Sequence, residues 1–90
     1  MKKNIAVVGC GQWGKNLVRI FNELGSLSSI CDLNEEITHK YAKQYNVKSS
    51  TFIEIINDPN IKGVVITTPA YLHASMAIDA MKAKKHVLVE

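Results

Sequence analysis

Three glycines at a fixed spacing are the residues of this chain with the clearest chemical use. Gly9, Gly11 and Gly14 form the pattern G-x-G-x-x-G at the end of an apolar run at residues 4–9. In a strand–turn–helix unit, the first glycine permits a tight turn and the second lets a diphosphate approach the backbone. The third lets the helix pack closely on the strand. The pattern therefore predicts a dinucleotide-binding turn.

Two further residues, Gln12 and Trp13, stand inside this motif at the expected start of the helix. Unpaired N–H groups and the helix dipole favour negative charge there, so we expect the backbone at both positions to bind phosphate oxygens. The Trp13 side chain has two interpretations, which the sequence leaves open. It either stacks near the cofactor or begins the core-facing side of the helix.

An acidic residue stands where a dinucleotide site requires one. Asp32 follows Gly14 by 18 residues and ends a second strand-like run at residues 27–32. A carboxylate at this place accepts hydrogen bonds from the adenosine ribose hydroxyls. It would repel a 2′-phosphate, and the next residues, Leu33 and Asn34, carry no compensating positive charge, so we expect NAD rather than NADP. The alternative is a glycine turn beside an unrelated surface aspartate.

Strand and helix patterns alternate along the whole chain. Apolar or β-branched runs predict strands at residues 4–9, 27–32, 47–49, 63–67 and 86–89. Helical periodicity predicts helices at residues 12–24, 34–45, 51–56 and 68–83. Short connections between alternating elements favour a parallel sheet covered on both faces. We therefore expect an α/β fold, a Rossmann-type doubly wound parallel sheet of about five strands.

Local signals place the ends of these helices. Gly25 suits a left-handed cap after the first helix, and Asn34 suits the N-cap of the second. Thr51 and Glu54 have the spacing of a capping box, and Thr68 followed by proline predicts a further N-cap. The core-facing side of the first helix is expected to comprise Trp13, Leu17, Ile20, Phe21 and Leu24.

Composition excludes several classes of protein. The chain has 90 residues, 47% of them hydrophobic, and a net charge of +3. No apolar run approaches the roughly 20 residues of a membrane span. Two cysteines, Cys10 and Cys31, make no disulfide framework, so we expect buried thiols and a cytoplasmic protein.

Other site types find no support in the sequence. His39, His73 and His86 have no metal-site spacing, and neither hydrolase nor triphosphatase motifs occur. The lysines near residue 84 are expected to be solvated at a helix end, with no nucleic-acid partner.

Four segments resemble the N-terminal domain of the glucose–fructose oxidoreductase / inositol dehydrogenase (Gfo/Idh/MocA) family. They are G-C-G-Q-W-G-K-N-L at residues 9–17, I-C-D-L at 30–33, D-P-N-I-K-G-V-V-I-T-T-P-A-Y-L-H at 58–73 and K-H-V-L-V-E at 85–90. The resemblance covers essentially the whole chain. Lys84 departs from the family, which usually has glycine there. If Lys84 adopts the left-handed conformation at the end of the helix, it costs about 1–2 kcal/mol; the alternative is a helix that ends differently.

The resemblance extends the expected cofactor site beyond the glycine turn. It implies that Thr67, Thr68 and Pro69 pass close to the adenosine and ribose side of NAD. His73, which follows Leu72 in the same T-T-P-x-x-L-H motif, would face the nicotinamide ribose. The resemblance also places Glu90 in an E-K-P motif whose lysine, at position 91, assists proton transfer. No catalytic residue is therefore expected within residues 1–90.

The resemblance also implies what the whole protein does. Residues 1–90 would form the NAD-binding, N-terminal part of a longer dehydrogenase that acts on a sugar, polyol or nucleotide-sugar hydroxyl. The W-G-K-N-L variant is similar to members that act on nucleotide-linked amino sugars or their uronates. The C-terminal substrate domain would be absent, so we expect no turnover by this chain alone. The full-length enzyme is expected to be a homo-oligomer.

Two other functions stay open on the sequence. One is a stand-alone module that senses NAD(H) without catalysis. The other is a domain for coenzyme A or S-adenosylmethionine, because glycine turns after a first strand serve these ligands too.

Overall fold

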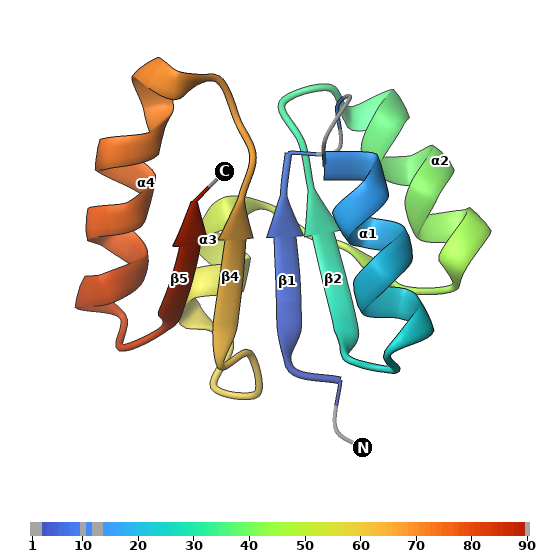
Figure 1. Ribbon diagram of the computed structural model, residues 1–90, viewed down its shortest axis with the longest axis horizontal. Coiled ribbons are helices and arrows are strands. Elements are labelled where there is room, and N and C mark those ends of the chain that lie inside the picture. Colours follow the sequence, from blue (N-terminus) through green and yellow to red (C-terminus); the bar gives the residue numbers. More distant parts are fainter. Residues whose placement is uncertain (1–2, 10, 12–13, 90) are drawn as a thin grey trace.

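The computed structural model describes residues 3–9, 11 and 14–89, which form a five-stranded parallel sheet with helices on both faces (Figure 1). The strands are β1 (Ile5–Val8), β2 (Leu27–Cys31), β3 (Lys48–Ser49), β4 (Gly63–Ile66) and β5 (His86–Val89). The helices are α1 (Gly14–Glu23), α2 (Glu35–Tyr45), α3 (Phe52–Asn57) and α4 (Ala70–Lys82). The expected α/β alternation and Rossmann-type sheet are confirmed.

The strand order β3-β2-β1-β4-β5 puts the reversal of the winding direction between β1 and β4. Val8, the last residue of β1, lies opposite Cys31 of β2 and Ile66 of β4. The carboxyl ends of these three strands therefore lie side by side, at the upper edge of the sheet in Figure 1. Ligands of open parallel sheets bind in the crevice at such a reversal.

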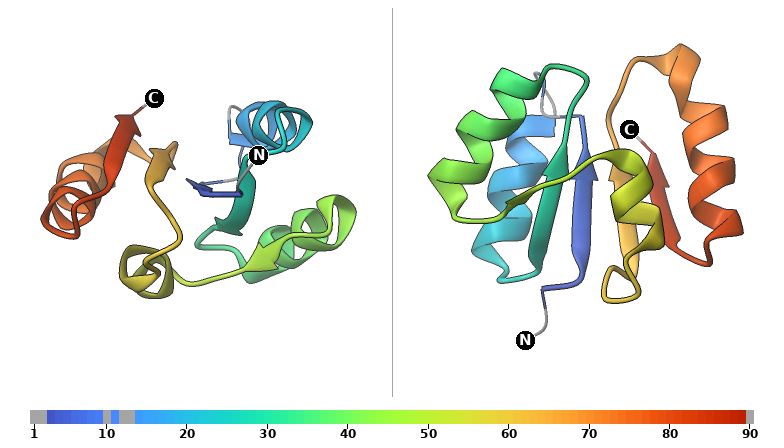
Figure 2. Two further views of the ribbon diagram at one scale, coloured as in Figure 1. Left: turned by 90° about the horizontal axis from the view of Figure 1, so that it is seen from below. Right: turned by 180° about the vertical axis from the view of Figure 1, so that it is seen from behind.

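Two apolar layers, one on each face of the sheet, hold the elements together. Successive residues of β1 alternate between them, because side chains along a strand point to opposite faces. Val7 joins the layer beneath α1 and α2, whereas Ala6 and Val8 join the layer beneath α3 and α4. Figure 2 shows α1 and α3 on opposite faces of the sheet.

The expected core-facing side of α1 is partly wrong. Ile20 and Leu24 are 39% and 56% exposed, whereas Val18 is completely buried. Leu17 and Phe21 do pack against the core, as expected. The helix is rotated from the expected phase because Gly14, at its first turn, is buried against the glycine turn. Trp13 lies outside the described residues.

The cap predictions have mixed outcomes. Asn34 Oδ1 accepts hydrogen bonds from the N–H groups of Glu36 and Ile37, and the capping box of α3 is present. Gly25 adopts the expected left-handed conformation, with φ of 76°.

The cap prediction for Thr68 is wrong. Pro69, with ψ of 145°, is the N-cap of α4 and supplies no side-chain bond. The Thr68 hydroxyl instead lies 3.4 Å from the sulfur of Met76.

The end of α4 and the strand that follows it agree with expectation. Lys84 has φ of 63°, the left-handed conformation that explains why the family usually has glycine at this position. His86 opens β5, where Leu88 and Val89 are exposed on the outermost strand. Within the described ranges, no helix is both long enough and apolar enough to cross a membrane.

Candidate functional site

The glycine turn lies directly against the end of β4. Gly9 has φ of +99°, and its N–H donates to the carbonyl oxygen of Cys31 at 2.7 Å. A Cβ atom on Gly9 would lie 2.7 Å from Thr67 Oγ1 and 2.8 Å from the Thr67 carbonyl carbon. Both the backbone conformation and the close contact therefore require glycine here.

Thr67 and Gly14 fix the turn from two further sides. The Thr67 hydroxyl donates to the carbonyl oxygen of Gly9 at 2.5 Å, so β4 holds the end of β1 in place. A Cβ atom on Gly14 would overlap that same carbonyl oxygen. The helix can start this close to the strand because residue 14 has no side chain, as the motif predicts.

Gly11 differs from the other two glycines of the motif. It is exposed, and a Cβ atom built on it would have no neighbour within 4 Å. Its carbonyl oxygen accepts the N–H of Lys15 at 2.9 Å, which ties it to the first turn of α1. Nothing in the described fold requires glycine at this position. The open space suits the close approach of a ligand, such as a diphosphate, to the backbone.

A pocket of about 320 Å³ lies at the carboxyl ends of β1, β2 and β4. It is lined by Gly9, Gly11, Asp32, Leu33, Thr67, Thr68 and Pro69. All of them except Leu33 were assigned to the site from the sequence. Gly9 and Gly11 belong to the glycine motif, Asp32 is the expected acidic residue, and the three residues after β4 were assigned through the resemblance. Residues 58 positions apart in the sequence, Gly9 and Thr67, thus line one pocket.

Asp32 is half-buried at the edge of this pocket. Its Oδ1 accepts the N–H of Asn34 at 2.8 Å, which fixes the carboxylate at the point where β2 leads into α2. The carboxylate and the open space beside Gly11 line the same pocket. This donor and acceptor arrangement fits the ribose and diphosphate of an adenine dinucleotide.

The other residues that the sequence assigned to the site are not among those that line the pocket. Leu72 and His73 lie in the first turn of α4, both half-buried. A ring nitrogen of His73, Nε2, is hydrogen-bonded to the carbonyl oxygen of Thr68, so Nε2 carries the proton in this pair. His73 therefore holds the loop that follows β4. Gln12, Trp13 and Glu90 lie outside the described residues.

A second hollow of about 420 Å³ continues from the first, and the two share Asp32 and Leu33. Residues from the beginnings of α2 and α3, with Met76 of α4, complete its wall. Sequence reasoning missed this hollow. The capping box did predict that Thr51 and Glu54 face each other, but not that Glu54 and Glu35 line the same hollow.

Cys31 lies at the base of this second hollow. Burial is the main reason why the pKa of its thiol is raised above 9.0, and the negative charges of Asp32 and Glu54 raise it further. The thiol is therefore neutral at pH 7. The expectation that Cys31 is a buried, unbridged thiol is confirmed, whereas Cys10 lies outside the described residues.

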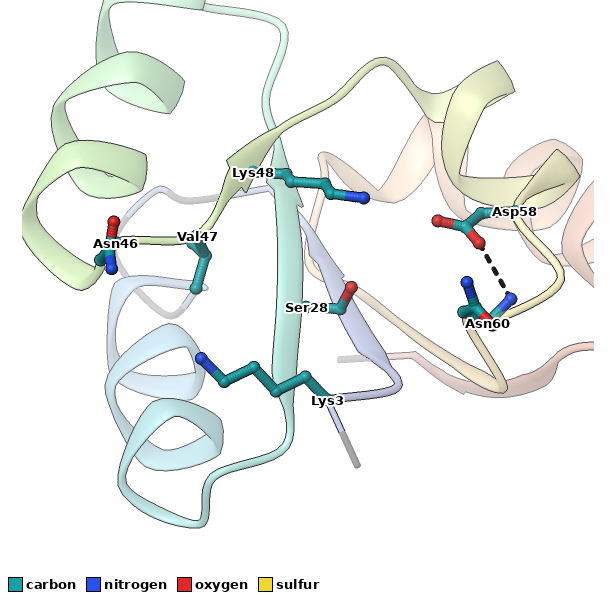
Figure 3. A pocket seen from close by; sticks show the side chains of 7 residues that line it. All are labelled: Lys3, Ser28, Asn46, Val47, Lys48, Asp58 and Asn60. Atoms are coloured by element: carbon teal, nitrogen blue, oxygen red, sulfur yellow. Dashed lines mark hydrogen bonds between the residues drawn. The ribbon is translucent and has the colours of Figure 1, made fainter. Parts of the chain in front are cut away.

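A larger hollow, of about 520 Å³, lies at the opposite edge of the sheet (Figure 3). Lys3, Ser28, Lys48 and Asn60 are among the polar residues around it, and Asp58 accepts the N–H of Asn60 at 2.9 Å. It lies at the amino ends of the strands, away from the glycine turn. Ligands of such sheets bind at the carboxyl ends of the strands. The pocket beside the glycine turn is therefore the candidate site, although this hollow is larger.

Comparisons with known proteins agree with this geometry. Residues 3–90 match the family described as "Oxidoreductase family, NAD-binding Rossmann fold". The levoglucosan dehydrogenase of Pseudarthrobacter phenanthrenivorans is 40% identical over 63 residues, which are 68% of this chain and 16% of that protein. The 2,7-anhydro-N-acetylneuraminate hydratase of Escherichia coli is 31% identical over 97% of this chain and 24% of its own length. The chain thus spans less than a quarter of either relative.

A solved structure supports the same assignment. The WlbA dehydrogenase of Bordetella pertussis, in complex with NADH and UDP-GlcNAcA, superimposes with a TM-score of 0.86 at 27% identity. The match covers 99% of this chain and 28% of that one. The resemblance that the motifs indicated is therefore confirmed. With its glycine turn, Asp32 and parallel sheet, this chain belongs to the Gfo/Idh/MocA oxidoreductase family, as an NAD-binding Rossmann domain.

Proposed function

We propose that the pocket at the carboxyl ends of β1, β2 and β4 binds NAD through specific residues of this chain. Backbone N–H groups at Gly11, Gln12 and Trp13 would hold the diphosphate, with Gly9 and Gly14 shaping the turn. Asp32 would accept hydrogen bonds from the adenosine ribose. The observation that carries the proposal is the shared pocket, in which Asp32 lies beside the open face of Gly11.

We further propose that the loop after β4 forms the opposite wall of the cofactor site. Thr67 anchors this loop through its bond to Gly9, and His73 through its bond to the Thr68 carbonyl oxygen. Pro69 would extend this wall along the adenosine and ribose side, and His73 would face the nicotinamide ribose, as the resemblance to the family implies. Leu72 and Glu90 would complete the wall. NAD, when bound, supplies the hydride acceptor, and these residues hold and orient it.

For the whole protein, we propose hydride transfer between NAD and a hydroxyl group of a sugar, polyol or nucleotide sugar. Residues 1–90 would be its N-terminal domain, and the catalytic groups would come from beyond them. The levoglucosan dehydrogenase relative and the NADH complex of WlbA support this reaction class. We also propose a cytoplasmic homo-oligomer, with no nucleic-acid or membrane partner.

The experiment is an assay of the full-length protein with NAD and a panel of sugars, polyols and nucleotide sugars, followed through the absorbance of NADH. A substrate that reduces NAD in the wild type, and does so far less in the D32N variant, supports the proposal. Binding of NAD with neither reduction nor conversion of any member of the panel favours the NAD(H)-sensing alternative.

A redox-neutral reaction is a second candidate, because one relative, which matches 97% of this chain, is named a hydratase. Such a reaction converts substrate without net accumulation of NADH. Product analysis by mass spectrometry, run beside the absorbance assay, separates the two candidates.

A further inference from the structure

The second hollow carries more negative charge than the cofactor pocket alone. Its wall includes Glu35 from the first turn of α2 and Glu54 from the first turn of α3, and it shares Asp32 with the cofactor pocket. His39 is its one residue that can become positive, and no lysine or arginine lines either hollow among the described residues. The ribose side of the site is thus next to three carboxylates.

The Glu54 carboxylate is held in place. Its Oε1 accepts the N–H of Thr51 at 2.8 Å, while the Thr51 hydroxyl accepts the N–H of Glu54 at 3.1 Å. Hydrogen bonds to the carboxylate, first from the Thr51 backbone N–H and then from the Thr51 side chain, lower the pKa of Glu54 below 4.5, so the group is ionised at neutral pH. A fixed, ionised carboxylate contributes a permanent field to the hollow beside it.

The charges of Asp32 and Glu54 act on the same small region. Both raise the pKa of the Cys31 thiol, which lies at the end of β2 directly before Asp32. The wall otherwise includes neutral groups such as Ser49 and Ser50 before α3. Of the described residues that line this hollow, an exposed histidine is the one group that could offset the carboxylates.

We propose that Glu54 and Glu35 are specificity determinants that act with Asp32 to disfavour the 2′-phosphate of NADP. A 2′-phosphate would bring about 1.5–2 negative charges next to Asp32 and face the field of the two glutamates. NAD carries a neutral 2′-hydroxyl there and is not penalised. This inference rests on the proposed function, because it takes the ribose to lie at Asp32.

The test measures the dissociation constants of NADH and NADPH by calorimetry with the full-length protein at low salt. In the variants E54Q and E35Q, an amide replaces each carboxylate at equal size, and in E54Q the new amide oxygen can still accept the Thr51 N–H. Coulomb's law at a separation on the order of 10 Å predicts that the NADPH:NADH ratio of dissociation constants falls about threefold per removed charge. Added salt should shrink this difference, because it screens exposed charges.

Glu23→Gln is the matched control, since Glu23 ends α1 at the opposite edge of the sheet and its change alters the net charge equally. Its ratio should equal that of the wild type. Thermal melting shows whether each variant is folded. If one glutamate variant does not fold, the ratio of dissociation constants measured with the other variant tests the inference. If the folded variants bind NADH and their ratio of dissociation constants equals that of the wild type, the inference is overturned. If the wild type does not bind NADH, the proposed function is overturned instead.

Discussion

Two glycines of one motif have separable roles at the level of single residues. Gly14 is required by packing, because a Cβ there would overlap the Gly9 carbonyl oxygen. A Cβ on Gly11 would meet no atom of the described residues within 4 Å, so packing among them does not require glycine there, whereas a bound diphosphate would. The sequence pattern predicts a different role for each glycine, and the contacts around Gly9 and Gly14 agree with the predicted turn and close packing.

Substitution of these glycines should therefore separate stability from binding. Gly14→Ala is expected to lower the free energy of unfolding by about 3 kcal/mol or more, because the backbone must move to separate the new methyl group from the Gly9 carbonyl oxygen. The melting temperature should fall by roughly 10 °C or more. Gly11→Val should leave the melting temperature within a few degrees of the wild type but weaken NADH binding at least about tenfold by blocking the diphosphate. Calorimetry and thermal melting of both variants check this, and equal losses of stability would contradict it.

Asp32 is the second residue whose role can be isolated. In the variant D32N, the amide oxygen can still accept the Asn34 N–H, so the loop should keep its shape. Loss of the charged acceptor is expected to weaken NADH binding about tenfold, as for a hydrogen bond to a charged group. NADPH binding should weaken less or improve, because the repulsion is removed. Calorimetric titration of D32N with NADH and with NADPH measures both affinities. A larger loss of affinity for NADPH than for NADH would disprove the assignment of Asp32 to the adenosine ribose.

At the level of helices and strands, two of the side-chain caps were predictable from neighbouring residues, whereas the rotation of α1 about its axis was not. Asn34 and the Thr51–Glu54 box depend on residues two or three apart, and both were found as expected. The cap at Thr68 failed because Pro69 stays extended and α4 begins one residue later. The buried side of α1 was misjudged at Ile20 because the glycine turn sets the rotation of the helix.

The capping box of α3 should make the stability of the protein depend on pH. Hydrogen bonds lower the pKa of Glu54 in the folded state, so its ionised form stabilises the fold above the ordinary value of 4.5. That contribution is lost as the pH falls through the lower, folded value. We expect the wild type to exceed E54Q in stability at pH 7 and the gap to narrow as the pH falls below 4.5 and through the lower, folded value. Urea unfolding of both proteins from pH 7 to pH 3 measures it, and a constant gap would refute it.

On the scale of the whole molecule, the site exists because distant segments meet at one edge of the sheet. The alternation of strands and helices was enough to predict this edge, since parallel strands with short crossovers leave few arrangements. The second hollow was not predictable, because it depends on how α2 and α3 begin on either side of Asp32. The fold brings Asp32, Glu35 and Glu54 together in its wall, although Glu54 is distant from the other two in the sequence.

The most direct test of the central claim is calorimetric titration of the folded, full-length protein with NADH, NADPH, coenzyme A and S-adenosylmethionine. Placement of the diphosphate at Gly11 and the ribose at Asp32 predicts saturable binding of NADH, weaker binding of NADPH and none of the other two ligands. Absence of NADH binding, or tighter binding of coenzyme A or S-adenosylmethionine, would contradict the account.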